Sequence, residues 1–254
     1  MKKFITLVVT LTLAVSVVSS VHAKRGSDGQ LNLLYWQAPS TMNPNLSGGT
    51  KELEASSVVI EPLARYDEKG NMLPWLAEKI PTVENGGVSK DLTSITWKIK
   101  KGIKWSDGSA FTADDVVFTY DYCIHPDTGC SHTNYYTGIS SVKALDRHTV
   151  KIQFNVAKPF PYSAFVGYNT PILQKAQFDG CQGAKAQECT KQNFYPIGTG
   201  PFKVVDFKAN DVIVFEANPN YRDPNKPAFS KLVFKGGGDA TSAARAVLET
   251  GEMD

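Results

Sequence analysis

Hydrophobic and polar residues alternate along several short stretches of the chain, a period of two that is typical of half-buried strands. In the clearest stretch, residues 95–100, Ile95, Trp97 and Ile99 share one side and polar residues the other. Strands are also predicted at 31–37, 140–146, 148–154, 202–207, 212–216 and 231–235. We therefore expect strands from one end of the chain to the other.

A helix is predicted soon after the strand at 95–100. Thr112 can cap it, and Asp115 three residues later forms a short capping box. Apolar residues follow at helical spacing as far as Ile124, and Pro126 makes His125 the expected end.

A second helix is predicted over residues 240–250. Asp239 can cap it, and Gly251 stands where a C-terminal glycine ends a helix. Its apolar residues form one stripe that is expected to pack on a sheet: Ala240, Ala243, Ala244, Val247 and Leu248. The glycines before this helix could also hold a phosphate, but the Gly-Lys-Ser/Thr ending of a P-loop is absent and Asp239 would repel the anion.

The first 23 residues have the pattern of a secretory signal peptide. Lys2 and Lys3 precede an apolar run, and Val21-His22-Ala23 forms a cleavage site of small residues. A transmembrane anchor is the alternative, but the run is shorter than the roughly 18–20 residues that span a bilayer. No cysteine that could carry a lipid lies near the site, so cleavage after Ala23 would release a periplasmic protein in a host with an outer membrane.

The charge balance gives no sign of a nucleic-acid partner. Without Lys2 and Lys3 the 27 basic residues fall to 25, which equals the 25 acidic residues. A nucleic-acid-binding protein would need a basic face. The charges are better explained as a mixed, solvated surface.

Four cysteines in an exported protein suggest disulfides. They form two local groups, Cys123 with Cys130 and Cys181 with Cys189, although three pairings are possible. The repeated Cys-x-His at 123–125 and 130–132 could instead supply four zinc ligands. An oxidising compartment favours the disulfides, and we expect neither a metal nor a cofactor.

Catalytic motifs are missing from the sequence. It contains no Gly-x-Ser-x-Gly and no His-Glu-x-x-His. The adjacent Asp114 and Asp115 lie at a predicted helix start, where acids complement the helix dipole. An enzyme, such as a periplasmic hydrolase, is therefore not predicted.

Two stretches carry a family resemblance. The first runs from Lys101 to Phe118, Lys-Gly-Ile-Lys-Trp-Ser-Asp-Gly followed by Phe-Thr-Ala-Asp-Asp-Val-Val-Phe. The second, Pro196 to Phe202, reads Pro-Ile-Gly-Thr-Gly-Pro-Phe and is followed by a hairpin and Asn-Pro-Asn-Tyr at 218–221. In this order, about eighty residues apart, they resemble the signatures of the peptide- and nickel-binding family of extracytoplasmic solute-binding proteins, the receptors of ABC importers.

This resemblance implies an α/β fold of the periplasmic-binding-protein kind, two-lobed, type II, with mixed sheets and an extra subdomain. Members of the family are roughly twice as long, so the chain is expected to be truncated to the first lobe, with the second lobe absent. Residues 24–66 and 195–254 would form a discontinuous ligand-binding core. Residues 67–194 would form the inserted, family-specific subdomain.

The resemblance also implies a function. The protein would be a monomeric substrate-binding component that captures short peptides for its cognate permease in the inner membrane. An opine, sugar-phosphate or oligosaccharide solute is the alternative, and a secreted interaction protein or hydrolase is less favoured.

The ligand site that the resemblance implies lies along the loop after the first strand and at the start of the last helix. Its candidate residues are Trp36, Asn43, Ser47, Thr50, Asp239 and Thr241. Three of these residues have a purely structural alternative. Trp36 could be a core residue, Asp239 only a helix cap, and the loop containing Asn43 a turn held by two prolines.

Overall fold

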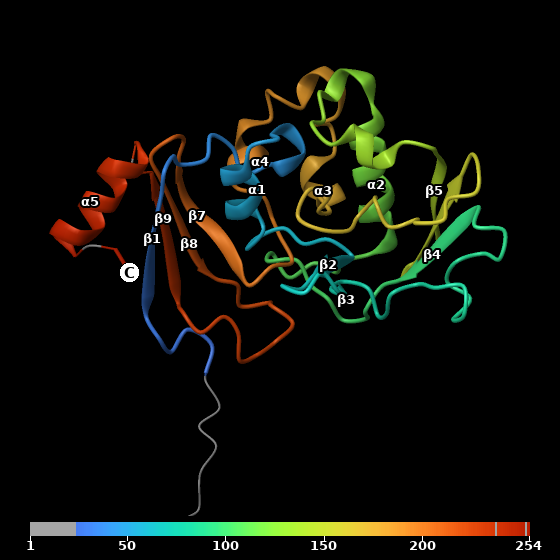
Figure 1. Ribbon diagram of the computed structural model, residues 1–254, viewed down its shortest axis with the longest axis horizontal. Coiled ribbons are helices and arrows are strands. Elements are labelled where there is room, and N and C mark those ends of the chain that lie inside the picture. Colours follow the sequence, from blue (N-terminus) through green and yellow to red (C-terminus); the bar gives the residue numbers. More distant parts are fainter. Residues whose placement is uncertain (1–23, 237, 252) are drawn as a thin grey trace, which may run out of the picture.

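The computed structural model describes residues 24–236, 238–251 and 253–254, so the predicted signal peptide lies outside the described residues. Two sheets lie at opposite ends of an elongated molecule, with several short helices between them (Figure 1). None of the helices in the described ranges is long and apolar enough to cross a membrane.

The first sheet is mixed, as expected, and has the strand order β1-β9-β8-β7. Its strands are β1 (Gln30–Tyr35), β9 (Lys231–Gly236), β8 (Val212–Ala217) and β7 (Phe202–Lys208). β1 pairs in parallel with β9 about two hundred residues later, and the other pairs are antiparallel. Alternate residues of β8 and β9 are buried, so one face of this sheet forms core.

The second sheet is antiparallel, with the order β4-β6-β5. It comprises β4 (Ser94–Lys98), β6 (Thr149–Phe154) and β5 (Ile139–Asp146), and α2 (Ala113–Ile124) contacts β5 and β6. Between the two sheets lies a short hairpin of β2 (Ala64–Tyr66) and β3 (Met72–Pro74). This hairpin crosses the boundary predicted after residue 66, and the division into two subdomains stays a prediction.

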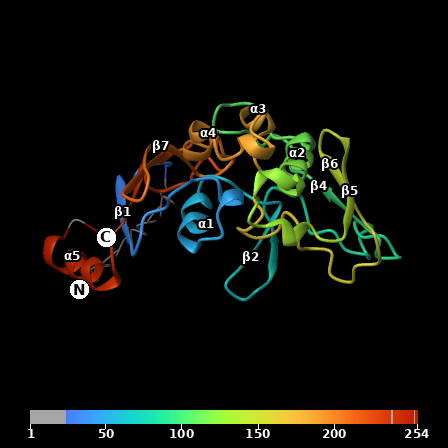
Figure 2. The ribbon, with the colours of Figure 1, turned by 90° about the horizontal axis from the view of Figure 1, so that it is seen from above.

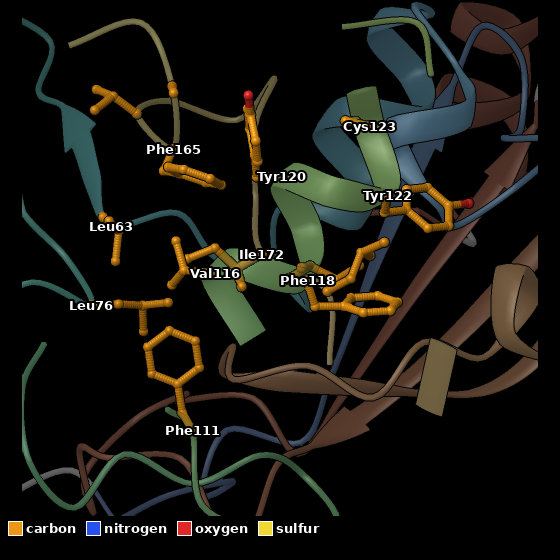
Figure 3. Packing of buried hydrophobic residues seen from close by; sticks show 14 of the residues in the cluster. Leu63, Leu76, Phe111, Val116, Phe118, Tyr120, Tyr122, Cys123, Phe165 and Ile172 are labelled. Carbon is orange, nitrogen blue, oxygen red and sulfur yellow. The ribbon is translucent and has the colours of Figure 1, made fainter. Parts of the chain in front are cut away.

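The helix predicted from the capping box is present as α2. The Thr112 backbone N–H donates to Asp115 Oδ2 (2.9 Å), and the helix ends before His125 and Pro126. Val116 and Tyr120 project from α2 toward side chains from distant segments, including Phe165 (Figure 3). Burial of this apolar face, more than helix propensity, stabilises the helix.

Both local disulfides are present, Cys123–Cys130 and Cys181–Cys189. With the four cysteines paired, no group of three or more His, Cys, Asp or Glu residues in the described part of the chain could hold a metal ion. The loops that the bridges close contain η2 (Pro126–Thr128) and η4 (Gly183–Lys185). The other short helices nearby are η3 (Thr133–Tyr136), α3 (Lys175–Phe178) and α4 (Thr190–Phe194).

The last helix, α5 (Ala240–Thr250), is capped by Asp239 and ends at Gly251 in the left-handed conformation, as predicted. The expectation that its apolar stripe packs on a sheet is wrong for Leu248, which is 85% exposed. The reason is position: α5 lies beyond the β1 edge of the first sheet, not over its face (Figures 1 and 2). At that edge the Asp254 N–H donates to Asn32 O (3.0 Å).

The Gly-Thr-Gly stretch at 198–200 passes tightly against the segment after α1 (Thr50–Ser56). Gly200 N donates to Val59 O (2.8 Å), and a Cβ on Gly198 or Gly200 would collide with the Val58 and Val59 carbonyls. Only glycine allows this approach. The second signature therefore joins β7 to the centre of the molecule, although β7 and β1 lie at opposite edges of the first sheet.

Candidate ligand-binding groove

A cavity of about 610 Å³ lies between α1, β2, η3 and the segment 160–169. α1 contributes Glu54, Ser57 follows the end of α1, and β2 contributes Arg65 and Tyr66. The remaining lining residues are Tyr135, Phe160, Tyr162, Ser163, Val166, Gly167, Tyr168 and Asn169. We call this cavity the groove. Five of its twelve lining residues are aromatic, a composition typical of small-molecule sites.

Three of the aromatic rings are exposed to solvent. The exposed fraction is 59% for Phe160, 47% for Tyr66 and 46% for Tyr168. Tyr162 is more firmly held, because its hydroxyl donates to Pro81 O (2.6 Å) and its ring packs edge-on against Phe160, with 5.0 Å between centroids. The groove therefore presents apolar ring surface that no other part of the described chain covers.

The wall formed by residues 165–169 is fixed by backbone hydrogen bonds to the start of β2 and the residue before it. Leu63 N donates to Phe165 O and Gly167 N donates to Ala64 O, both at 2.9 Å. Phe165 itself has a φ of 61°, which is strained for a large side chain. Its ring is fully buried and packs edge-on against Tyr136, with 5.5 Å between centroids, which offsets the strain. The wall is thus preorganised.

The groove contains one acidic and one basic side chain. Glu54 is exposed and accepts a hydrogen bond from the Tyr35 hydroxyl (2.5 Å). Arg65 donates from Nη2 to Ser57 O (2.7 Å), and its guanidinium lies 4.7 Å from the centre of the Trp75 ring. Burial lowers the pKa of Arg65, and burial raises the pKa of Tyr66. The wall therefore offers both signs of charge beside neutral rings.

None of the six predicted site residues lines the groove. Asn43 is fully buried; its amide donates to Tyr122 Oη (3.1 Å) and Asn193 Oδ1 (2.9 Å) and so positions the loop. Ser47 Oγ accepts from Gly49 N (3.1 Å), and the exposed Thr50 begins α1, one turn before Glu54. Ligand contact by these residues stays a prediction.

The other three predicted residues lie near the first sheet. Trp36 is 45% exposed and stacks on Tyr35, with 5.4 Å between centroids. Asp239 Oδ1 accepts from the N–H groups of Thr241 (2.9 Å) and Ser242 (3.0 Å), which is the geometry of a helix cap. A role for Trp36, Asp239 or Thr241 in ligand binding also stays a prediction.

The residues of the groove were missed because its main wall has no clear sequence period. Residues 158–171 are rich in proline and aromatics and predict neither a helix nor a strand. The available signal was the density of aromatics, with Phe160, Tyr162, Phe165 and Tyr168 within nine positions. Only the fold brings this segment next to α1.

Residues 71–254 match the model of the bacterial extracellular solute-binding proteins, family 5 Middle. The chain belongs to this family. The resemblance inferred from Lys101–Phe118 and Pro196–Phe202 is thereby confirmed, and so is the expected α/β solute-binding fold.

Individual relatives of this family-5 chain bind peptides, according to their names. The chain is 31% identical to the oligopeptide-binding protein AppA of Bacillus subtilis, over 85% of this chain and 38% of AppA. It is 32% identical to the dipeptide-binding protein of Escherichia coli, over 87% of this chain and 42% of that protein. The solved structure of AppA in complex with a nonapeptide has a TM-score of 0.79 and 29% identity, covering 91% of this chain and 44% of AppA. The chain thus spans less than half the length of these relatives.

Proposed function

We propose that the chain is the first lobe of the substrate-binding component of an ABC importer, which captures short peptides outside the cytoplasmic membrane and delivers them to a permease. The observation that carries the proposal is the open, aromatic-lined groove, found in a chain whose family includes oligopeptide- and dipeptide-binding proteins.

In this proposal the groove is one side of a cleft that a second lobe closes. Ligand bound to the first lobe makes further contacts in the closed form, and this differential affinity shifts the population toward closure. The closed form is what the permease would recognise. A single open wall buries little of a ligand, so the chain alone should bind weakly.

Calorimetry tests the two-lobe account. Isothermal titration of residues 24–254 with a mixture of short peptides is expected to show no heat at micromolar protein, because half of the contacts are missing. The full-length protein from its native host is expected to carry peptide, which mass spectrometry of the co-purified ligand would identify. Tight binding by residues 24–254 alone would contradict the proposal. An oligosaccharide or sugar phosphate as the co-purified ligand would favour the alternative solute class.

A further inference from the structure

We infer that the groove selects peptides that present a flat aromatic side chain; the inference rests on the proposed function. The observation is the convergence of five rings from three separate parts of the chain. Tyr66 comes from β2, Tyr135 from η3, and Phe160, Tyr162 and Tyr168 from the segment 160–169. Aromatic pairs are stabilised beyond the apolar area that they bury. A ligand ring would therefore gain more here than an aliphatic side chain of similar size.

The charges on the wall favour neither sign of ligand side chain. A basic side chain would be attracted by Glu54 but repelled by Arg65. An acidic side chain would be attracted by Arg65 but repelled by Glu54. Glu54 also already accepts a hydrogen bond from Tyr35, and Arg65 already donates one to Ser57 O. A charged side chain would lose water without finding an unopposed partner. Neutral side chains are thus favoured in the groove.

The shape and rigidity of the wall favour a flat group. Gly167 has a φ of +79°, and no atom outside residues 166–168 lies within 4 Å of the position where a Cβ would be. No other segment therefore covers this part of the wall, which backbone hydrogen bonds already hold in place. A preorganised wall loses little conformational entropy when a ligand binds. A ring can therefore lie against it without rearrangement.

Saturation-transfer NMR detects the weak binding expected of one lobe. Residues 24–254 would be titrated with Ala-Phe-Ala, Ala-Leu-Ala, Ala-Lys-Ala and Ala-Glu-Ala at millimolar concentration. We expect the phenylalanine peptide to bind roughly three- to tenfold more tightly than the leucine peptide, the range that ring–ring contacts give. The lysine and glutamate peptides should bind no more tightly than the leucine peptide.

Two variants test the rings directly. Tyr168→Ala should lower the affinity for Ala-Phe-Ala to that for Ala-Leu-Ala, and Tyr168→Phe should keep the preference. Leu145→Ala is the matched control, because Leu145 is 57% exposed on β5 and does not line the groove. Circular dichroism would check that each variant is folded.

The outcomes separate the inference from the proposed function. If all four peptides bind equally, or Tyr168→Ala keeps the preference, the aromatic selectivity is wrong although peptide capture stands. If no peptide gives a saturation-transfer signal at millimolar concentration but an oligosaccharide does, peptide capture is wrong, and the proposed selectivity for aromatic peptides is then wrong as well.

Discussion

His132 shows how one buried residue links a disulfide-bonded segment to the loop after β1. It is 6% exposed, and its Nε2 lies 3.1 Å from Ser47 O, so the neutral ring can donate to this carbonyl. Burial lowers the pKa of His132 below its ordinary value of 6.5. The folded state therefore holds the neutral imidazole, and the unfolded state takes up a proton more readily.

This difference predicts a pH dependence of stability. With the folded pKa depressed, the contribution of His132 is fully present above pH 6.5 and is lost as the pH falls toward the folded pKa. The free energy of unfolding, measured in urea, should thus fall between pH 7.5 and pH 5.5. The fall should be smaller in His132→Gln, while His148→Gln, at the turn before β6, should behave as the unmodified chain. An equal fall in all three proteins would rule out His132 as the cause.

At the scale of elements, close backbone contacts decide how strands and helices join. The Gly198–Gly200 stretch lies against the chain after α1 because both glycines lack a side chain. Gly200 N and Phe202 N donate to Val59 O (2.8 Å) and Val58 O (3.1 Å), so this junction resembles a short strand pair. β2 follows one side of this junction in the chain and β7 follows the other, so the junction helps to position both strands.

Gly200→Ala should therefore be strongly destabilising. The new Cβ would lie 2.5 Å from Val58 O and 2.7 Å from Val59 O, and these backbone atoms cannot move aside. We expect a loss of about 1–3 kcal/mol in the free energy of unfolding. Gly48→Ala is the matched control, since Gly48 has a negative φ and no neighbour within 4 Å of its would-be Cβ. Its change should stay within about 0.5 kcal/mol; equal losses would show that the close contact is not the reason.

At the scale of the whole molecule, Glu61 links segments that lie next to the two sheets in the chain. Its buried carboxylate accepts two hydrogen bonds from Arg222 (2.6 and 3.1 Å), one from Thr199 (2.8 Å) and one from Trp75 (2.6 Å). These partners lie before the second sheet and on both sides of the β7–β8 hairpin. The same region also holds the segment that follows the wall of the groove, because Ile172 N donates to Glu61 O (3.1 Å).

Removal of this carboxylate should lower the stability of the whole molecule. Glu61→Ala leaves the guanidinium of Arg222 without its partner, and we expect a loss of about 3–5 kcal/mol in the free energy of unfolding. Glu216→Ala breaks the exposed pair with Lys203 (3.7 Å) and should cost less than about 1 kcal/mol. Urea unfolding measures both. A double change, Glu61→Leu with Arg222→Met, should recover part of the loss, and failure to do so would show that the charge pair is not what Glu61 contributes.

The sequence by itself determined the local elements and the family of this chain. The capping box at Thr112, the cap at Asp239 and the period-two strands depend on neighbours within a few residues, so they could be predicted and are present. Tertiary structure alone decided the parallel pairing of β1 with β9, the exposure of Leu248 and the groove. Each of these depends on residues that are distant in the chain: Tyr66 and Tyr168 face one cavity only because backbone hydrogen bonds hold residues 165–167 against β2. Contacts of that kind have no period, because chain folding and not spacing brings their members together.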